Sequence, residues 1–265
     1  MKKAVHSNDI ARCAGLSRTA GHAVGGQNAA MSILYRLLPL LTMLSAVIAI
    51  LALSRLGLPF DWGFIAKPLT TLLIIAYAWP RGTTVPRLGS RLRLGLVFSL
   101  AGDTFLLWPE QGFLPGLVSF LLAHLAYIAG FCNQARFARI AWPFALFAAA
   151  AAAVLSYLWA GVPAPLQVPV LAYVACLASM SAQSWVWWRV AATDEDQAGP
   201  ARWAAIGGLL FLCSDALLAT NKFAGPLPQA TAWVLTSYWA AQWCIASSLA
   251  PAGISRAYIP LNKWV

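Results

Sequence analysis

Two aspartates stand inside long apolar stretches of the chain, and their surroundings resemble each other. The stretch GLVFSLAGDTFLLW holds Asp103, and the stretch GGLLFLCSDALLAT holds Asp215. Each acid follows a glycine, Gly95 or Gly207, at the same separation of eight residues. An ionisable side chain at membrane depth costs about 2.5–3.5 kcal/mol on insertion scales, so such residues usually serve a function. We therefore predict that Asp103 and Asp215 form the functional site.

Two carboxyl groups in one cavity can hold a single proton between them at neutral pH, which suits combined acid and base catalysis. One group then protonates a substrate atom while the other activates a water molecule. The sequence shows no serine elbow, no cluster of metal ligands and no glycine loop that could cradle phosphate. It therefore favours acid–base addition of water, without a metal or cofactor, over a covalent serine route or a metal route.

Further polar residues are predicted to line one cavity that opens on the outer side of a membrane. Lys67 precedes Pro68 near the start of an apolar segment, where proline suits a first helical turn and the ammonium would need an anionic partner. His124 and Tyr127 share a helix face at i and i+3. Snorkelling of Lys67 to the interface is the alternative for that residue, and polar side chains also commonly join membrane helices. The other predicted binding residues are Ser99, Ser214, Asn221, Lys222, Tyr238 and Gln242.

The elements that position these residues follow from the composition. The chain has 265 residues, 60% hydrophobic and 10% charged, with a mean hydropathy of +0.70, whereas soluble domains carry about 25% charged residues. We predict an all-α polytopic membrane protein with eight transmembrane helices, separated by segments rich in Pro and Gly. The expected spans are about 32–54, 63–80, 94–108, 114–132, 140–160, 166–188, 203–221 and 229–249.

The third and seventh of these spans hold the two aspartates, and an offset of four spans preserves direction. This spacing indicates a possible parallel 4+4 internal repeat. Asp103 lies about five residues before the outer end of its span and Asp215 about six or seven, so both acids are expected roughly 8–10 Å below the outer boundary of the membrane. The predicted domains are a disordered cytoplasmic tail at 1–30, the eight-helix membrane domain at 31–250 and a short cytoplasmic tail at 251–265. A start at Met31 is the alternative explanation of the first segment.

The distribution of cations predicts the orientation in the membrane. With the N-terminus inside, fifteen Lys and Arg residues fall in cytoplasmic segments and two in outer loops. We expect both termini in the cytoplasm and the protein in the inner or plasma membrane of the cell. The net charge of +10 then reflects this asymmetry and attraction to anionic lipids, so we expect membrane lipids and no nucleic acid as partners. The sequence leaves the oligomeric state open.

Several pieces of the chain resemble the YhhN-like lysoplasmalogenase family: GLVFSLAGDTFLL, GLVSFLLAHLAYIAGF, GLLFLCSDALLATNKF and the segment Lys67-Pro68-Leu69. The similarity covers most of residues 32–250. It implies an eight-helix membrane hydrolase with a lysophospholipid substrate. Such enzymes cleave the vinyl ether bond of a lysoplasmalogen to a fatty aldehyde and glycerophosphoethanolamine or glycerophosphocholine.

This resemblance implies that Asp103 and Asp215 act as acid and base, in an order that the sequence does not specify. The hypothesis gives the phosphate to Lys67 and Lys222, and the alkenyl chain to Leu and Phe residues of the inner half. Water and glycerol oxygens are assigned to His124, Tyr127, Tyr238 and Gln242.

Other classes of protein also fit buried acids in a membrane. A proton-coupled transporter of a small amphiphile is the main alternative, because parallel repeats with membrane-depth acids suit transport. An intramembrane aspartyl protease is weaker: Gly102-Asp103 matches a Gly-Asp pair, but Asp215 lacks the Tyr-Asp setting expected of a partner. A purely structural membrane protein is the remaining possibility.

Overall fold

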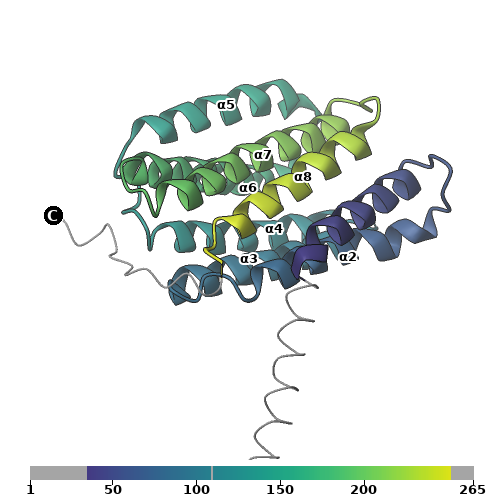
Figure 1. Cartoon of the computed structure of the whole chain (residues 1–265). Coiled ribbons are helices and arrows are strands. Elements are labelled where there is room, and N and C mark those ends of the chain that lie inside the picture. Colours follow the sequence, from purple (N-terminus) through teal and green to yellow (C-terminus); the bar gives the residue numbers. More distant parts are fainter. Residues whose placement is uncertain (1–34, 109, 252–265) are drawn as a thin grey trace, which may run out of the picture. The chain divides into compact units, whose positions relative to one another are not determined.

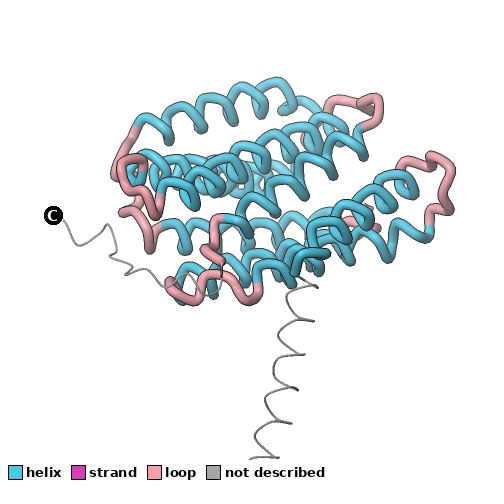
Figure 2. The backbone as a smooth tube through the Cα atoms, viewed as in Figure 1, coloured by secondary structure: helices cyan, strands magenta, loops and turns pink. Residues whose placement is uncertain are grey.

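The computed structural model describes residues 35–108 and 110–251, and every regular element in those ranges is helical (Figures 1 and 2). A turn of 3-10 helix, η1 (Trp159–Gly161), follows the fifth helix. The predicted tails, apart from Pro251, lie outside the described residues. The eight α-helices of the described ranges are Tyr35–Leu53, α2 (Asp61–Ala78), α3 (Pro86–Phe105), α4 (Phe113–Phe131), α5 (Trp142–Leu158), α6 (Ala164–Ala191), α7 (Ala198–Phe223) and α8 (Ala230–Ser247).

The chain is an integral membrane protein. Five helices in the described ranges are long and apolar enough to cross a membrane: Tyr35–Leu53, Phe113–Phe131, Trp142–Gly161, Ala164–Ala191 and Ala198–Phe223.

The all-helical prediction is thus confirmed. The remaining three helices, α2, α3 and α8, do not meet the same criterion of length and hydropathy. Arginines in the first half of α3 and polar side chains in α2 and α8 reduce their hydropathy. Eight spans and the 4+4 repeat therefore stay predictions.

Two helix starts differ from the expected spans. Helix α3 begins at Pro86, eight residues before the expected start at 94, because proline suits the first turn and the following arginines do not interrupt a helix. Helix α2 begins at Asp61, so Pro68 lies inside the helix and not in its first turn, which corrects our expectation. Membrane helices tolerate such a proline when neighbouring groups satisfy the freed carbonyl.

The chain divides into two compact units, residues 1–41 and 42–265. The described part of the first unit, 35–41, is the start of the first helix. In the second unit α3 packs against α2 and α4, α7 packs against α6 and α8, and α2 also contacts α8. Helix α5 lies at the edge of this unit, beside α6 (Figure 1).

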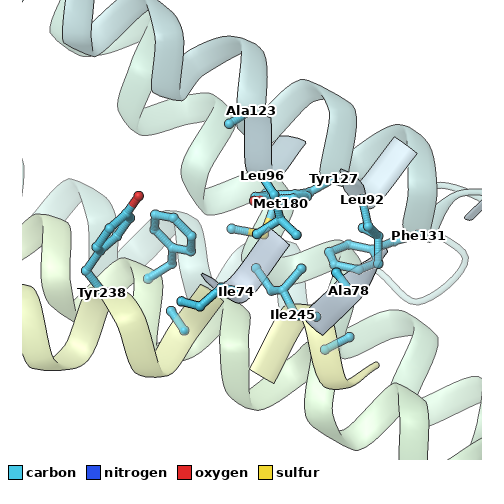
Figure 3. Close-up of a cluster of buried hydrophobic side chains, with 14 of the residues drawn as sticks. Ile74, Ala78, Leu92, Leu96, Ala123, Tyr127, Phe131, Met180, Tyr238 and Ile245 are labelled. Carbon is cyan, nitrogen blue, oxygen red and sulfur yellow. The ribbon is translucent and has the colours of Figure 1, made fainter. Parts of the chain in front are cut away.

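The core of the second unit draws side chains from α2, α3, α4, α6, α7 and α8 (Figure 3). Two glycines allow α4 to approach α3. A Cβ at Gly95 would lie 2.2 Å from the Tyr127 ring, and one at Gly102 would lie 2.6 Å from the Phe120 ring. The close approach places these α4 aromatic rings against the part of α3 that carries Asp103.

Candidate active site

Asp103 lies near the end of α3 in a closed hydrogen-bond network. The residue is 1% exposed. Oδ2 accepts hydrogen bonds from Thr71 Oγ1 at 2.6 Å and from the Tyr238 hydroxyl at 2.8 Å. Oδ1 lies 3.9 Å from Lys67 Nζ. A cation and two hydroxyl donors favour the charged form of a carboxyl group and offset part of the cost of burying it.

The Asp103 network continues toward α4. Gln242 Nε2 donates to the Tyr238 hydroxyl at 3.0 Å, and the Tyr127 hydroxyl donates to Gln242 Oε1 at 2.8 Å. Ser99 Oγ lies 3.4 Å from the same Tyr127 hydroxyl. The donors from Tyr127, Gln242 and Tyr238 point in succession toward Asp103, and aligned hydrogen bonds of this kind strengthen one another.

Asp215 has a different environment. It is partly buried on α7, and its Oδ2 accepts a hydrogen bond from the Tyr173 hydroxyl of α6. Both residues line a cavity of about 350 Å³ whose walls come mainly from α5, α6 and α7. Among the described residues that line it, the side chains with a heteroatom are Tyr173, Cys213 and Asp215. Within the described part of the chain, Asp215 is therefore the carboxyl group of a largely apolar cavity.

The two carboxyl groups have separate partners. Within residues 35–108 and 110–251, no hydrogen bond or ion pair joins Asp103 to Asp215. Phe120 lines the Asp215 cavity, and its ring also contacts the ring of Tyr238 edge-on at 5.7 Å between centroids. An aromatic ring thus adjoins both environments. The expectation that both acids face one wet chamber stays a prediction.

The depths of the acids along their helices also differ from the estimate. Asp103 lies two residues before the end of α3, whereas Asp215 lies eight residues before the end of α7. The sequence estimate placed both acids about five to seven residues from the outer helix ends. The two acids are therefore not equivalent in distance from those ends.

His124 on α4 is fully buried, at 0% exposure. Its ring contacts the rings of Tyr173 and Phe211 edge-on, with centroids 5.3 and 4.9 Å away. Neither ring nitrogen has a hydrogen-bond partner among the described residues. A buried unpaired nitrogen is costly unless a water or ligand satisfies it. This observation supports the predicted role of His124 as a water-holding residue, which stays a prediction.

The remaining predicted residues lie nearer to α7 and the loop that follows it. Ser214 Oγ donates to the Val234 carbonyl of α8 at 3.1 Å, which joins two helices. Asn221 Oδ1 accepts from the Leu227 amide at 2.9 Å and so fixes the loop after α7. The Lys222 ammonium lies 4.3 Å from the centre of the Phe113 ring. Of these three, Lys222 is the one beside the cavity, because Phe113 lines it.

Sequence reasoning missed three residues of the site. Thr71 had a signal, because it lies four residues after Lys67 and must share its helix face. Trp239 donates from Nε1 to Thr71 Oγ1 at 3.3 Å, and the sequence prediction gave this tryptophan no role. Tyr173 is a lone tyrosine in an apolar span, and only the packing of α6 against α7 brings it to Asp215.

These features define a class: a helical integral membrane protein with one buried and one partly buried carboxyl group, the second of which lines a largely apolar cavity. The chain belongs to the YhhN family, whose model matches residues 62–249. That range includes both aspartates.

The chain is similar to human lysoplasmalogenase TMEM86A, with 34% identity over 173 residues, which are 60% of this chain and 65% of that protein. Human lysoplasmalogenase TMEM86B is 33% identical over 187 residues, 69% of this chain and 74% of that protein. Pig lysoplasmalogenase TMEM86B is 37% identical over 163 residues, 60% of this chain and 63% of that protein. The match with the human TMEM86A protein thus covers slightly less than two thirds of its length. No solved structure matches the chain.

Proposed function

We propose that the protein is a lysoplasmalogenase. It would add water to the vinyl ether bond of a lysoplasmalogen and release a fatty aldehyde and glycerophosphoethanolamine or glycerophosphocholine. Family membership and the names of the curated relatives support this activity. The observation that carries the proposal is the position of Asp215, a carboxyl group that lines an apolar cavity and is held by Tyr173. Such walls suit a hydrocarbon chain with one reactive polar group.

The reaction needs a proton donor and a water molecule. The π electrons of the vinyl ether take a proton at the β-carbon, which leaves an oxocarbenium ion at the carbon next to oxygen. Water adds to that carbon and returns one proton to the enzyme. The hemiacetal then breaks into an aldehyde and an alcohol, so the net reaction consumes only water. A carboxyl group that alternates between acid and base is sufficient for both proton transfers.

We assign these transfers to Asp215, which lines the cavity. In its protonated form it gives the proton to the β-carbon. Its carboxylate then stabilises the cation and takes a proton from the attacking water. Tyr173 fixes the oxygen Oδ2 and leaves Oδ1 for the substrate. His124, whose ring contacts that of Tyr173, is our choice for the residue that holds the water.

Asp103 takes a different part in this proposal. Its partners Lys67, Thr71 and Tyr238 favour its charged form. We assign it the role of positioning the side chains that link α2, α3 and α8. In the alternative expected from the sequence, Asp103 itself activates the water. That route needs a water-filled connection past Phe120. The phosphate is assigned to Lys222, because Lys67 already has an anionic partner.

Purified protein in detergent micelles tests the function directly. We expect equal amounts of aldehyde and of glycerophosphoethanolamine or glycerophosphocholine from a lysoplasmalogen. The matching alkyl ether lysolipid, which has no double bond to protonate, should remain intact. Failure to release aldehyde, combined with uptake of the lipid into proteoliposomes, would favour the transporter.

We also propose that both termini face the cytoplasm, on the basis of the cation asymmetry. A reporter that is active only in the cytoplasm should then give a signal when it is fused to either end. A reporter active on the outer side would contradict this orientation.

A further inference from the structure

The cavity beside Asp215 extends along α7. Leu209 and Phe223 both line it, and fourteen residues separate them, about 21 Å at the rise of an α-helix. Asp215 lies between these limits. Near the C-terminal end of α7, Phe113 lines the cavity. The Lys222 ammonium lies over the ring of Phe113. The cavity therefore has a cation near one end, a carboxyl group along its length and apolar walls beyond the carboxyl group.

Exposed side chains of α5 and α7 form part of the cavity wall. Val154 of α5 and Leu209 of α7 line it, and they are 37% and 41% exposed. Cys213 of α7 also lines it and is exposed. In a membrane protein the exposed apolar surface of such helices faces acyl chains. This part of the wall therefore lies on a surface that faces acyl chains and not bulk water.

Small side chains on α5 leave room in the cavity that Asp215 lines. Phe147 is 4% exposed and fills the gap between α5 and α6 against Ala178 and Ala182. One turn later, Ala150 and Ala151 line the cavity, where larger side chains would occupy it. These two alanines are therefore part of its wall.

We propose that this cavity binds the hydrocarbon chain of a single-chain lipid that enters sideways from the bilayer between α5 and α7, and that Ala150 and Ala151 determine whether the chain fits. The volume is at the lower end of the range for ligand pockets, about 300–1,000 Å³, which suits one chain and not two. The phosphate of the head group lies at Lys222. Because lipid tails are as apolar as the cavity walls, selection depends on shape and not on hydrophobic transfer.

This inference rests on the proposed function for the reactive bond, but binding of the chain can be measured without turnover. The probe is an alkyl ether lysophosphatidylcholine with a diazirine in its chain, which carries no vinyl ether. After irradiation, mass spectrometry should find the label on α5 and α7. Unlabelled alkyl ether lysolipid should compete, and a two-chain phosphatidylcholine should not.

Substitutions on α5 give the decisive comparison. Ala150→Leu and Ala151→Leu should each reduce labelling roughly tenfold, because the larger side chain and the lipid chain would then compete for the same space. Ala152→Leu is the matched control, because Ala152 is exposed and does not line the cavity. Ala150 is also exposed, so Ala150→Leu tests the inference even where Ala151→Leu fails to fold. Equal labelling in the three variants would overturn the inference.

Turnover separates this inference from the proposed function. Ala150→Leu should retain cleavage of a butenyl lysoplasmalogen and lose cleavage of the hexadecenyl form. Labelling of α5 and α7 without any aldehyde release from the wild-type protein would support the binding site and refute the hydrolase. Aldehyde release with the label on other helices would refute the binding site and leave the hydrolase standing.

Discussion

Asp103 and Asp215 occupy matching sequence stretches but opposite chemical environments. Asp103 has a cation and two hydroxyl donors, and its network extends through Gln242 to Tyr127. Asp215 has one hydroxyl donor, from Tyr173, and otherwise lines an apolar cavity. Similar sequence around two acids therefore does not make them equivalent. The neighbouring helices determine what each acid can do.

The difference suggests a division of work. A carboxylate with several donors stabilises its neighbours and resists protonation, so it makes a poor acid. A carboxyl group with few donors and an accessible cavity can exchange protons with a bound molecule. We infer that Asp103 and its partners stabilise the fold, whereas Asp215 carries out the proton transfers of the reaction.

Replacement of each acid by its amide tests this division most strongly. Asp215→Asn should lower the rate of aldehyde release about 10²–10⁴-fold, the usual contribution of a general acid–base group, with little change in the melting temperature. Asp103→Asn should lower the melting temperature clearly, because it leaves the buried Lys67 without its anion. Aldehyde release and thermal unfolding in detergent measure the two effects.

Glu110→Gln serves as the control, since Glu110 is an exposed carboxyl in the loop after α3. It should alter neither the rate nor the melting temperature. Equal loss of rate in both aspartate variants, with both melting temperatures unchanged, would contradict this division and support the joint acid–base pair expected from the sequence.

The buried ion pair offers a second contrast. Lys67→Met should destabilise the protein by about 3 kcal/mol, since breaking one side of a buried pair leaves an uncompensated charge. The double variant Lys67→Met with Asp103→Asn should recover much of this loss, because neither charge remains. Thermal unfolding of the four proteins in a double-mutant cycle measures the coupling. Additive losses would show that Lys67 and Asp103 do not depend on each other.

The sequence predicted part of this site for a physical reason. Charged residues inside apolar segments are rare and expensive, so Asp103, Asp215 and Lys67 could be selected without a structure. The anionic partner that Lys67 needed was also foreseen, as either a carboxylate or a phosphate. The choice between them depends on how α2 packs against α3, which the sequence does not specify.

The partners of Asp215 could not be predicted in the same way. Tyr173 is an unremarkable residue in an apolar helix until α6 packs against α7 and brings its hydroxyl to the carboxyl group. The cavity depends on small side chains of α5 that look like ordinary helix formers in the sequence. The fold class was predictable from hydropathy, whereas contacts between helices distant in sequence were not.

Loss of the Tyr173 hydroxyl should affect the chemistry and not the binding. Tyr173→Phe keeps the ring that contacts His124 and removes the hydrogen bond to Asp215. A hydrogen bond to a charged group contributes about 1.5–3 kcal/mol, so we expect kcat to fall at least tenfold with KM nearly unchanged. Steady-state kinetics over a range of pH measure both constants. A rise in KM with an unchanged kcat would mean that Tyr173 contributes to substrate binding and not to the reaction.

The smallest effect is expected at the far end of the Asp103 network. Tyr127→Phe removes the donor to Gln242 Oε1 and leaves that oxygen buried without its partner, at a cost of about 1 kcal/mol in stability. Two residues separate Tyr127 from Asp103, and the network does not include Asp215, so kcat should fall by no more than about threefold. Tyr157→Phe is the control, because Tyr157 is 73% exposed on α5. A large loss of kcat in Tyr127→Phe at an unchanged melting temperature would mean that the Asp103 network takes part in proton transfer, and the two environments would then have to be treated as one site.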